Sequence, residues 1–334
     1  MIGLGGAGCA HRSPVIPEAA WERLQFSRPQ MGVPFRIVVY ATHEPLAQRA
    51  VEAAYARIAE LNRIFSDYDP DSEVSRLCHD TPVGVEAPVS AELAFLIGRS
   101  QALAKASDGA FDITVGPLVN LWRRARRHKE LPPANLQAEA WARVGWQHLR
   151  LDRRHPAVSF GVADMRLDFG GIAKGYAADE ALRVLREHGF PRALIAAAGD
   201  VTAGDPPPGQ KGWRVDIGGS EGDAARKPRT VLLVNAAIGT SGDSFQFLEI
   251  GGVRYSHILD PRTGIGVTNR CLVTVIAHDG VTSDSLGTAV SVLGPEAGLR
   301  LVERTPGAAA LVVGSPEGGA IEQASRRLQR WLVE

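Results

Sequence analysis

The sequence predicts an α+β protein, because helix-like and strand-like segments alternate along it and some of the strands pair as hairpins. Its 334 residues include 37 basic and 37 acidic side chains, and 45% of them are hydrophobic. That length allows one large domain or two, with a sizeable core. The net charge of zero argues against a duplex-DNA binder, and no run approaches the 18 or so apolar residues of a membrane span. Three cysteines are too few for a disulfide framework or a zinc site.

Residues 1–25 are predicted to be a flexible tail or the remnant of a signal. A Gly-x-Gly-x-x-Gly spacing begins at Gly3, but no strand precedes it and Pro14 follows, so it does not predict dinucleotide binding. Small residues leading into Cys9 are similar to the end of a bacterial lipoprotein signal, although a basic segment is missing and the apolar run is short. A truncated signal and a plain tail both stay open.

Apolar periodicity and capping residues locate the expected elements. Helices are expected at 45–64, 90–106, 118–127, 135–144, 174–188, 281–293 and 295–303. Strands are expected at 35–40, 193–197, 213–217, 231–236, 246–250, 273–277 and 308–313. Segments 246–250 and 253–258 flank two glycines and indicate a hairpin, so the sheet is not purely parallel. The six basic side chains of 123–129 either steer an anionic ligand or form a solvated face.

The segment from Asp168 to Asp179 carries the strongest chemical signal. A strand is expected to end on Asp168, and the glycines Gly170 and Gly171 let the backbone approach a ligand closely. Lys174 then begins a helix, where backbone N–H groups and an ammonium favour phosphate oxygens. The alternative is a tight strand-to-helix turn with a solvated Lys174.

Two earlier segments place aromatic and polar groups at turns. Within 65–77, Tyr68 could offer a flat, half-buried face to an aromatic ligand. Within 109–122, Phe111 and Asp112 precede a Gly-Pro helix start, which brings backbone N–H groups and a carboxylate to a helix entrance. Taken alone, each segment is explained more simply as a turn or a helix cap.

The last two polar segments offer a base and a cation site. His257 is expected at a strand end beside Asp260 and Arg262, where an imidazole can transfer protons near neutral pH. Asp284 and Thr288 are four residues apart on an expected helix, so their oxygens lie on one face. A carboxylate and a hydroxyl without His or Cys suit Mg²⁺ rather than zinc. A structural role for His257 and an N-cap at Asp284 are the alternatives.

Taken in order, these segments resemble the ApbE family of FAD:protein FMN transferases. The resemblance covers roughly residues 26–315, through segments 31–35, 65–77, 109–122, 168–179, 198–200, 240–243, 257–264 and 284–288. It implies a T-fold-like α+β architecture for residues 26–334, a single domain with FAD in a cleft between two lobes. It also implies Mg²⁺ at the FAD diphosphate and transfer of FMN from FAD to a Thr hydroxyl of an acceptor protein, with release of AMP.

The resemblance assigns roles to individual residues as well. It places FAD contacts at Met31, Tyr68, Ala110, Phe111, Asp112, Asp168, Lys174 and Ile258. It assigns Mg²⁺ to the Gly171 carbonyl and the Asp284 and Thr288 side chains, and it makes His257 and Asp284 the catalytic pair. The acceptor is then expected to be a protein such as a membrane redox-complex subunit. Because the family is typically exported in bacteria, the resemblance also implies a periplasmic location, with a lipid anchor through Cys9.

Two departures from the family pattern bear on the site. Gly287 stands where the metal-binding helix usually has Ala, which weakens a helix by about 0.5–1 kcal/mol. The basic stretch 123–129 replaces a segment that commonly contains Gly, and this changes one edge of the cleft. Two other functions stay open: an FAD pyrophosphatase that uses water in place of the Thr hydroxyl, and a non-catalytic flavin-binding protein.

Overall fold

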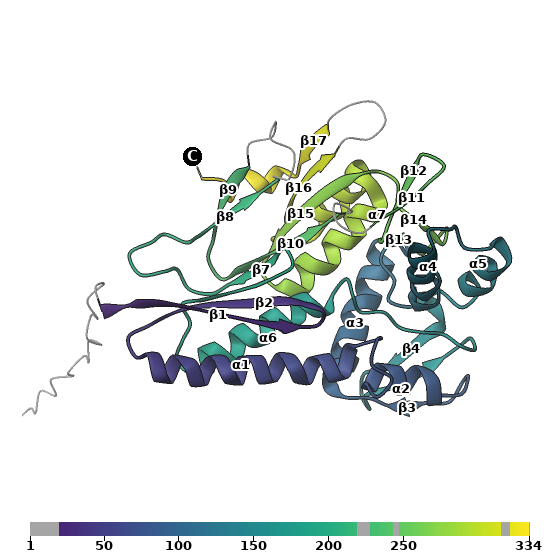
Figure 1. The fold of residues 1–334 in the computed structure, drawn as a ribbon, viewed down its shortest axis with the longest axis horizontal. Coiled ribbons are helices and arrows are strands. Elements are labelled where there is room, and N and C mark those ends of the chain that lie inside the picture. Colours follow the sequence, from purple (N-terminus) through teal and green to yellow (C-terminus); the bar gives the residue numbers. More distant parts are fainter. Residues whose placement is uncertain (1–19, 219–227, 243–246, 315–320, 334) are drawn as a thin grey trace, which may run out of the picture.

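The computed structural model describes residues 20–218, 228–242, 247–314 and 321–333, and its centre is one eight-stranded sheet (Figure 1). The strand order is β1-β2-β6-β7-β10-β15-β16-β17, and every neighbouring pair is antiparallel. The strands are β1 (Glu22–Gln30), β2 (Val33–Ala41), β6 (Ala193–Ala197), β7 (Asp200–Ala203), β10 (Ala236–Ser241), β15 (Cys271–Ala277), β16 (Ala309–Gly314) and β17 (Ile321–Ala324). Together with the helices, this sheet confirms the predicted α+β class.

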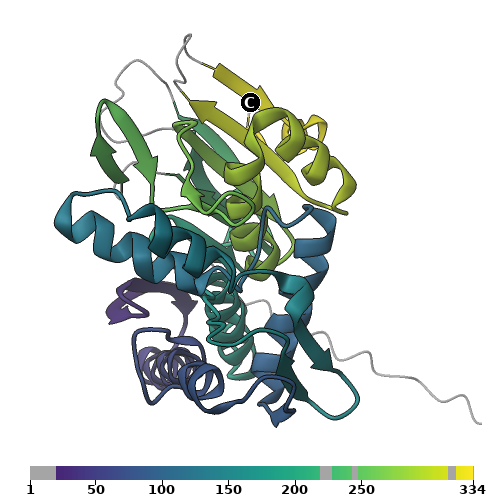
Figure 2. The same ribbon diagram turned by 90° about the vertical axis from the view of Figure 1, so that its right-hand side faces the viewer.

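Three helices pack on one face of this sheet and bury the main core (Figures 1 and 2). They are α1 (Glu44–Phe65), α6 (Ala173–Glu187) and α7 (Gly280–Arg304). The opposite face packs against β8 (Trp213–Ile217), β9 (Arg229–Leu233) and the 3-10 turn η3 (Arg326–Arg330). In β2, Ile37 and Val39 join the helical side while Val38 joins the other side, as the two-residue period of a strand requires.

The remaining elements lie beside the sheet, toward the right of Figure 1. The helices are α2 (Glu73–Asp80), α3 (Ala91–Ala106), α4 (Gly116–His128) and α5 (Ala134–Trp141), with the 3-10 turn η2 (Trp146–His148). The strands are β3 (Ala87–Pro88), β4 (Leu149–Asp152), β5 (Ala157–Phe160), β11 (Phe247–Ile250), β12 (Val253–Ser256), β13 (Leu259–Asp260) and β14 (Ile265–Gly266). The predicted hairpin around Gly251 is confirmed as the antiparallel pair β11–β12.

The predicted tail reaches too far, because residues 22–25 form the first half of β1 and pair with β2. Leu24 and Phe26 of this edge strand pack on the core, and Pro29 is tolerated there because an edge strand leaves some N–H groups unpaired. The expected strand at 231–236 is also wrong. It spans the end of β9, a turn in which Asn235 has φ 49°, and the start of β10.

The two helices expected at 281–293 and 295–303 are confirmed as two helical segments of α7, which meet at a kink. Gly294 has φ 75° within α7 and Pro295 follows it, so the helix bends where the sequence predicts a break. The N-cap of α7 is Asp279, whose side chain accepts a hydrogen bond from the Thr282 N–H. This excludes the N-cap alternative for Asp284, which lies inside the helix.

Helices α6 and α7 approach each other closely where two glycines face each other. A Cβ added at Gly175 would overlap the Gly280 carbonyl oxygen and lie 2.9 Å from the Cβ of Asp284. At the same place the Gly175 N–H donates a 3.0 Å hydrogen bond to Asp284 Oδ2. Asp179 of α6 accepts hydrogen bonds from the N–H groups of Gly280 and Val281, which holds the start of α7 against α6.

We predict that Gly175→Ala destabilises the protein by about 1–3 kcal/mol, because the new methyl group overpacks a backbone contact. This cost exceeds the gain of about 1 kcal/mol that Ala brings over Gly in a helix. Gly287→Ala is the matched control on α7, since its Cβ would meet its nearest neighbour at 3.4 Å, and it should be neutral or stabilising. Urea denaturation of both variants measures the difference, and equal stabilities would contradict the close approach.

Candidate active site

Lys174 lies between two buried carboxylates at the start of α6. Its Nζ is 3.5 Å from Asp200 Oδ2 and 3.6 Å from Asp284 Oδ1, and it donates a 3.0 Å hydrogen bond to the Gly170 carbonyl. Only 23% of the Lys174 side chain is exposed, and 7% of each carboxylate side chain. The alternative of a solvated Lys174 is therefore wrong.

The pKa values in this cluster follow from burial and charge. Burial raises the pKa of Asp200 to about 7, with a further increase from Asp284, while Lys174 and the Thr240 N–H oppose the rise. Burial alone would lower the pKa of Lys174, but the Asp284 and Asp200 carboxylates raise it above its ordinary value. The ammonium therefore stays charged at neutral pH and is shared by both acids.

The three expected metal ligands lie together. A Cβ at Gly171 would sit 2.8 Å from Thr288 Oγ1, so the absence of a side chain lets this backbone approach Thr288 closely. Thr288 is one turn beyond Asp284 on α7. Within the described residues no cluster of three His, Cys, Asp or Glu side chains could hold a metal. The Gly171, Asp284 and Thr288 set, with one carboxylate and two neutral oxygens, suits a cation that also takes phosphate oxygens as ligands.

A second ion cluster joins Asp168 to the loop that carries Tyr68. Arg123 of α4 donates a 3.2 Å hydrogen bond to Asp168 and pairs with Asp67, and its guanidinium lies 4.1 Å from the centroid of the Tyr68 ring. Burial raises the pKa of Asp168, the Asp67 charge adds to the rise, and Arg123 opposes it. The Asp168 carboxylate also accepts a 2.7 Å hydrogen bond from the Gly170 N–H. The strand expected to end on Asp168 is wrong, because only an isolated bridge between Arg166 and Val115 forms there.

The loop between α3 and α4 places Ala110, Phe111 and Asp112. Asp112 is buried, and its two oxygens accept 2.8 Å hydrogen bonds from the N–H groups of Thr114 and Trp146. Burial raises the pKa of this acid, and these hydrogen bonds oppose the rise. Its side chain therefore holds the loop in place. Phe111 is buried in the main core.

His257 is half-buried and lies directly after β12, at the strand end where the sequence predicts it. The neighbouring Ile258 packs with Ala110 and with Val292, which is one turn beyond Thr288 on α7. Two predicted FAD contacts, Ile258 and Ala110, are therefore brought together against the helix that carries the candidate metal ligands.

Two tryptophans hold the turn that follows His257. Trp122 of α4 and Trp141 of α5 each donate a 2.9 Å hydrogen bond to a carbonyl of the turn, from Gly264 and Pro261 respectively. Within the turn Arg262 pairs with Asp260 at 2.8 Å, so these two charges largely satisfy each other.

Met31 lies at the turn between β1 and β2, where it has φ 50° and precedes Gly32 at φ 77°. This two-residue hairpin turn lies at the same sheet end as the Ala198–Gly199 turn, because Phe35 pairs with Ala197. Asp200 begins the next strand there. The structure therefore brings the predicted Met31 to the sheet end from which Asp200 reaches Lys174.

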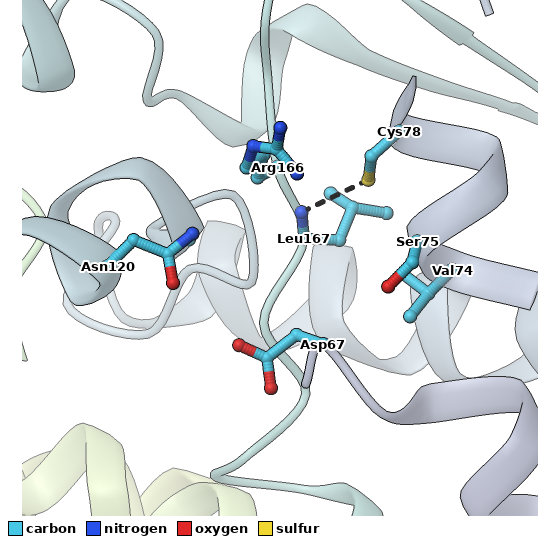
Figure 3. A pocket seen from close by; sticks show the side chains of 8 residues that line it. Asp67, Val74, Ser75, Cys78, Asn120, Arg166 and Leu167 are labelled. Atoms are coloured by element: carbon cyan, nitrogen blue, oxygen red, sulfur yellow. Dashed lines mark hydrogen bonds between the residues drawn. The ribbon is translucent and has the colours of Figure 1, made fainter. Parts of the chain in front are cut away.

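A small polar cavity of about 20 Å³ lies behind Asp67 and has room for one water molecule (Figure 3). Asn120, Arg166 and the thiol of Cys78 line it as well, and Cys78 accepts a hydrogen bond from the Leu167 N–H. Burial raises the pKa of Cys78 to about 11. The thiol is therefore protonated at neutral pH, which fits a packing role.

The sequence did not single out Asp200 and Arg123 as site residues, although both lie within it. Asp200 ends a Gly-Asp turn, and such a turn at a strand start was the available signal. Arg123 belongs to the basic run 123–129, and nothing in that run distinguishes the inward-facing arginine from its exposed neighbours.

Comparison with known proteins decides the family. The sequence profile of the ApbE family matches residues 31–312. The chain belongs to the ApbE family. The FAD:protein FMN transferase of Klebsiella pneumoniae is 31% identical over 294 residues, which cover 86% of this chain and 83% of that protein. The protein of the same name from Escherichia coli is 29% identical over 307 residues, covering 89% of this chain and 86% of its own.

Solved structures of the family have the same fold. The apo crystal structure of the flavinyl transferase ApbE of Pseudomonas stutzeri is 31% identical with a TM-score of 0.81, covering 93% of this chain and 97% of its own. The ApbE protein of Thermotoga maritima is 30% identical with a TM-score of 0.83, covering 94% and 100% of the two chains.

We predict that Lys174→Ala destabilises the metal-free protein by about 2–3 kcal/mol at pH 8, because it leaves two buried carboxylates unneutralised. The pKa of Asp200 is about 7 with Lys174 present and rises further without it. At pH 5.5 this acid is neutral, so the loss should be smaller than at pH 8.

Urea denaturation at the two pH values in a chelating buffer measures the loss. Lys105→Ala, on the exposed side of α3, is the control and should show no such pH dependence. If Lys174→Ala lost more stability at pH 5.5 than at pH 8, the sharing of the Lys174 ammonium by Asp200 and Asp284 would be contradicted.

Proposed function

We propose that the protein is an FAD:protein FMN transferase, which moves FMN from FAD to a threonine hydroxyl of an acceptor protein and releases AMP. Relatives of that name match more than four-fifths of the chain. The observation that carries the proposal is the pairing of Lys174 with Asp284 at the start of α6, together with the close approach of Gly171 to Thr288. The excess of carboxylate over ammonium in this cluster favours a divalent cation, and such a cation neutralises the charge of the FAD diphosphate.

The reaction is a displacement at the FMN phosphorus. The threonine oxygen forms a new bond to that phosphorus, and the bond from the phosphorus to the AMP oxygen breaks, with its electron pair leaving on AMP. In this proposal His257 takes the hydroxyl proton, and the proton then passes to solvent. The half-buried position of His257, next to Ile258 and α7, supports this role.

Mg²⁺ would be held by the Gly171 carbonyl and by the Asp284 and Thr288 side chains. The donor set fits, because these are hard oxygen ligands and the Gly171 backbone comes close to the Thr288 hydroxyl. When bound, the ion neutralises charge on the diphosphate oxygens. Lys174 offsets part of the negative charge of Asp200 and Asp284.

The experiment incubates the purified protein with FAD and Mg²⁺, with and without co-expressed candidate acceptor proteins. Mass spectrometry of the acceptor should show one added FMN on a threonine, and chelation or Asp284→Ala should abolish the addition. Release of free FMN at the same rate with and without an acceptor would indicate an FAD pyrophosphatase. Binding of FAD without either product would indicate a non-catalytic flavin protein.

We predict that His257→Ala lowers the transfer rate by roughly 10²–10⁴-fold, the usual scale for the loss of a general base. FAD binding should be nearly unchanged, because the imidazole acts on the acceptor proton. Single-turnover transfer at saturating FAD measures the chemical step separately from binding.

His155→Ala is the control, since that side chain is 89% exposed, and its rate should equal that of the wild type. A His257→Ala variant with a full single-turnover rate and poor FAD affinity would leave His257 a packing residue.

An exported, periplasmic location with a lipid anchor on Cys9 also belongs to the proposal. Its support is the run of small residues before Cys9, which lies outside the described residues. None of the helices within the described ranges has the length and apolar character needed to cross a bilayer. Fatty-acid labelling in cells should mark the wild type and not Cys9→Ser, and equal labelling would contradict the anchor.

A further inference from the structure

Arg123 touches two residues that the family resemblance assigns to FAD. Its NH2 group donates to Asp168, and its guanidinium lies over one face of the Tyr68 ring. Its NH1 group pairs with Asp67, the residue before Tyr68. One side chain of α4 therefore links the loop that carries Tyr68 to the segment that leads into Lys174.

The backbone beneath Arg123 is firmly held. Trp122 is 1% exposed and donates its hydrogen bond to Gly264, and Leu118 is buried beside it. At the start of α4, a Cβ on Gly116 would lie 2.8 Å from the carbonyl carbon of Arg166, so the helix presses on the segment before Asp168. Arg123 is 19% exposed, and its guanidinium is paired at both ends, with Asp67 through NH1 and with Asp168 through NH2.

The Tyr68 ring, in contrast, has little support of its own. The residue is 77% exposed, and the Arg123 guanidinium covers one of its faces. Because 77% of the residue is exposed, much of the flat ring is accessible to a planar ring system that could stack on it. An exposed aromatic side chain would otherwise lose rotamer freedom when a ligand binds, and that loss weakens binding.

We propose that Arg123 is a positioning residue of the flavin site, which holds the Tyr68 ring so that its open face receives the isoalloxazine of FAD. This inference rests on the proposed function, because it requires FAD to bind beside Tyr68. The guanidinium is suited to the task, since it is planar, stacks on an aromatic ring and pairs with two carboxylates at once. A lysine at this position would supply a point charge without the stacking plane.

The test measures the Kd for FAD by flavin fluorescence in Mg²⁺ buffer, together with kcat and KM for transfer. Arg123→Ala should raise the Kd about 3- to 30-fold, the scale of a cation–π contact, with kcat changed by less than about twofold. Because Arg123 acts through Tyr68, adding Arg123→Ala to Tyr68→Ala should weaken binding no further. Arg124→Ala, the exposed neighbour on the same helix, is the matched control and should bind FAD normally.

Arg123→Lys keeps the positive charge beside Asp67 and Asp168, so this variant should fold even if Arg123→Ala does not. Because lysine lacks the stacking plane, it should still bind FAD more weakly than the wild type. Unchanged or tighter binding by either variant would overturn the inference, and so would additive losses in the double variant. A wild type that binds no FAD would overturn the proposed function itself. If Tyr68→Ala weakens FAD binding and Arg123→Ala does not, only this inference is overturned.

Discussion

The site depends on the close approach of α6 and α7 at Gly175 and Gly280. Only glycines allow the two backbones to meet there, and the contact lets the Gly175 N–H bond to Asp284. Lys174, one residue earlier, is thereby brought to the same carboxylate. The same two helices supply all three expected metal ligands, since Gly171 directly precedes α6 and Thr288 follows Asp284 by one turn of α7. A shift of this helix contact would therefore separate Lys174 from Asp284.

Two ion clusters, each with one basic and two acidic side chains, are held next to each other by this part of the structure. In one, Lys174 is shared by Asp200 and Asp284, and in the other, Arg123 is shared by Asp67 and Asp168. The short run 168–174 joins them, because Gly170 donates to Asp168 and its carbonyl accepts from Lys174. Each cluster has one more negative than positive group, and most of these groups are largely buried. Such an excess favours a bound cation, as the proposed function requires at Asp284.

Those parts of the fold and of the site that depend on residues close together in the chain could be predicted from the sequence. The kink at Gly294 and the helix start near Lys174 follow from residues close in the chain. Residues 22–25 were missed because an edge strand with Pro29 has a weak pattern and is stabilised by pairing with β2. Asp200 and Arg123 were missed for a related reason. Their partners, Lys174 for one and Asp67 and Asp168 for the other, are between 26 and 56 residues away, and no local pattern encodes such contacts.

The central claim is that Gly171, Asp284 and Thr288 hold a divalent cation at the FAD diphosphate. Crystals grown with FAD and Mn²⁺, an ion that also takes oxygen ligands, test it directly through anomalous scattering. The account predicts one strong anomalous peak bonded to the Gly171 carbonyl, the Asp284 carboxylate, the Thr288 hydroxyl and phosphate oxygens of FAD. FAD bound in the site with no peak at these three residues, or a peak held by other groups, would contradict it.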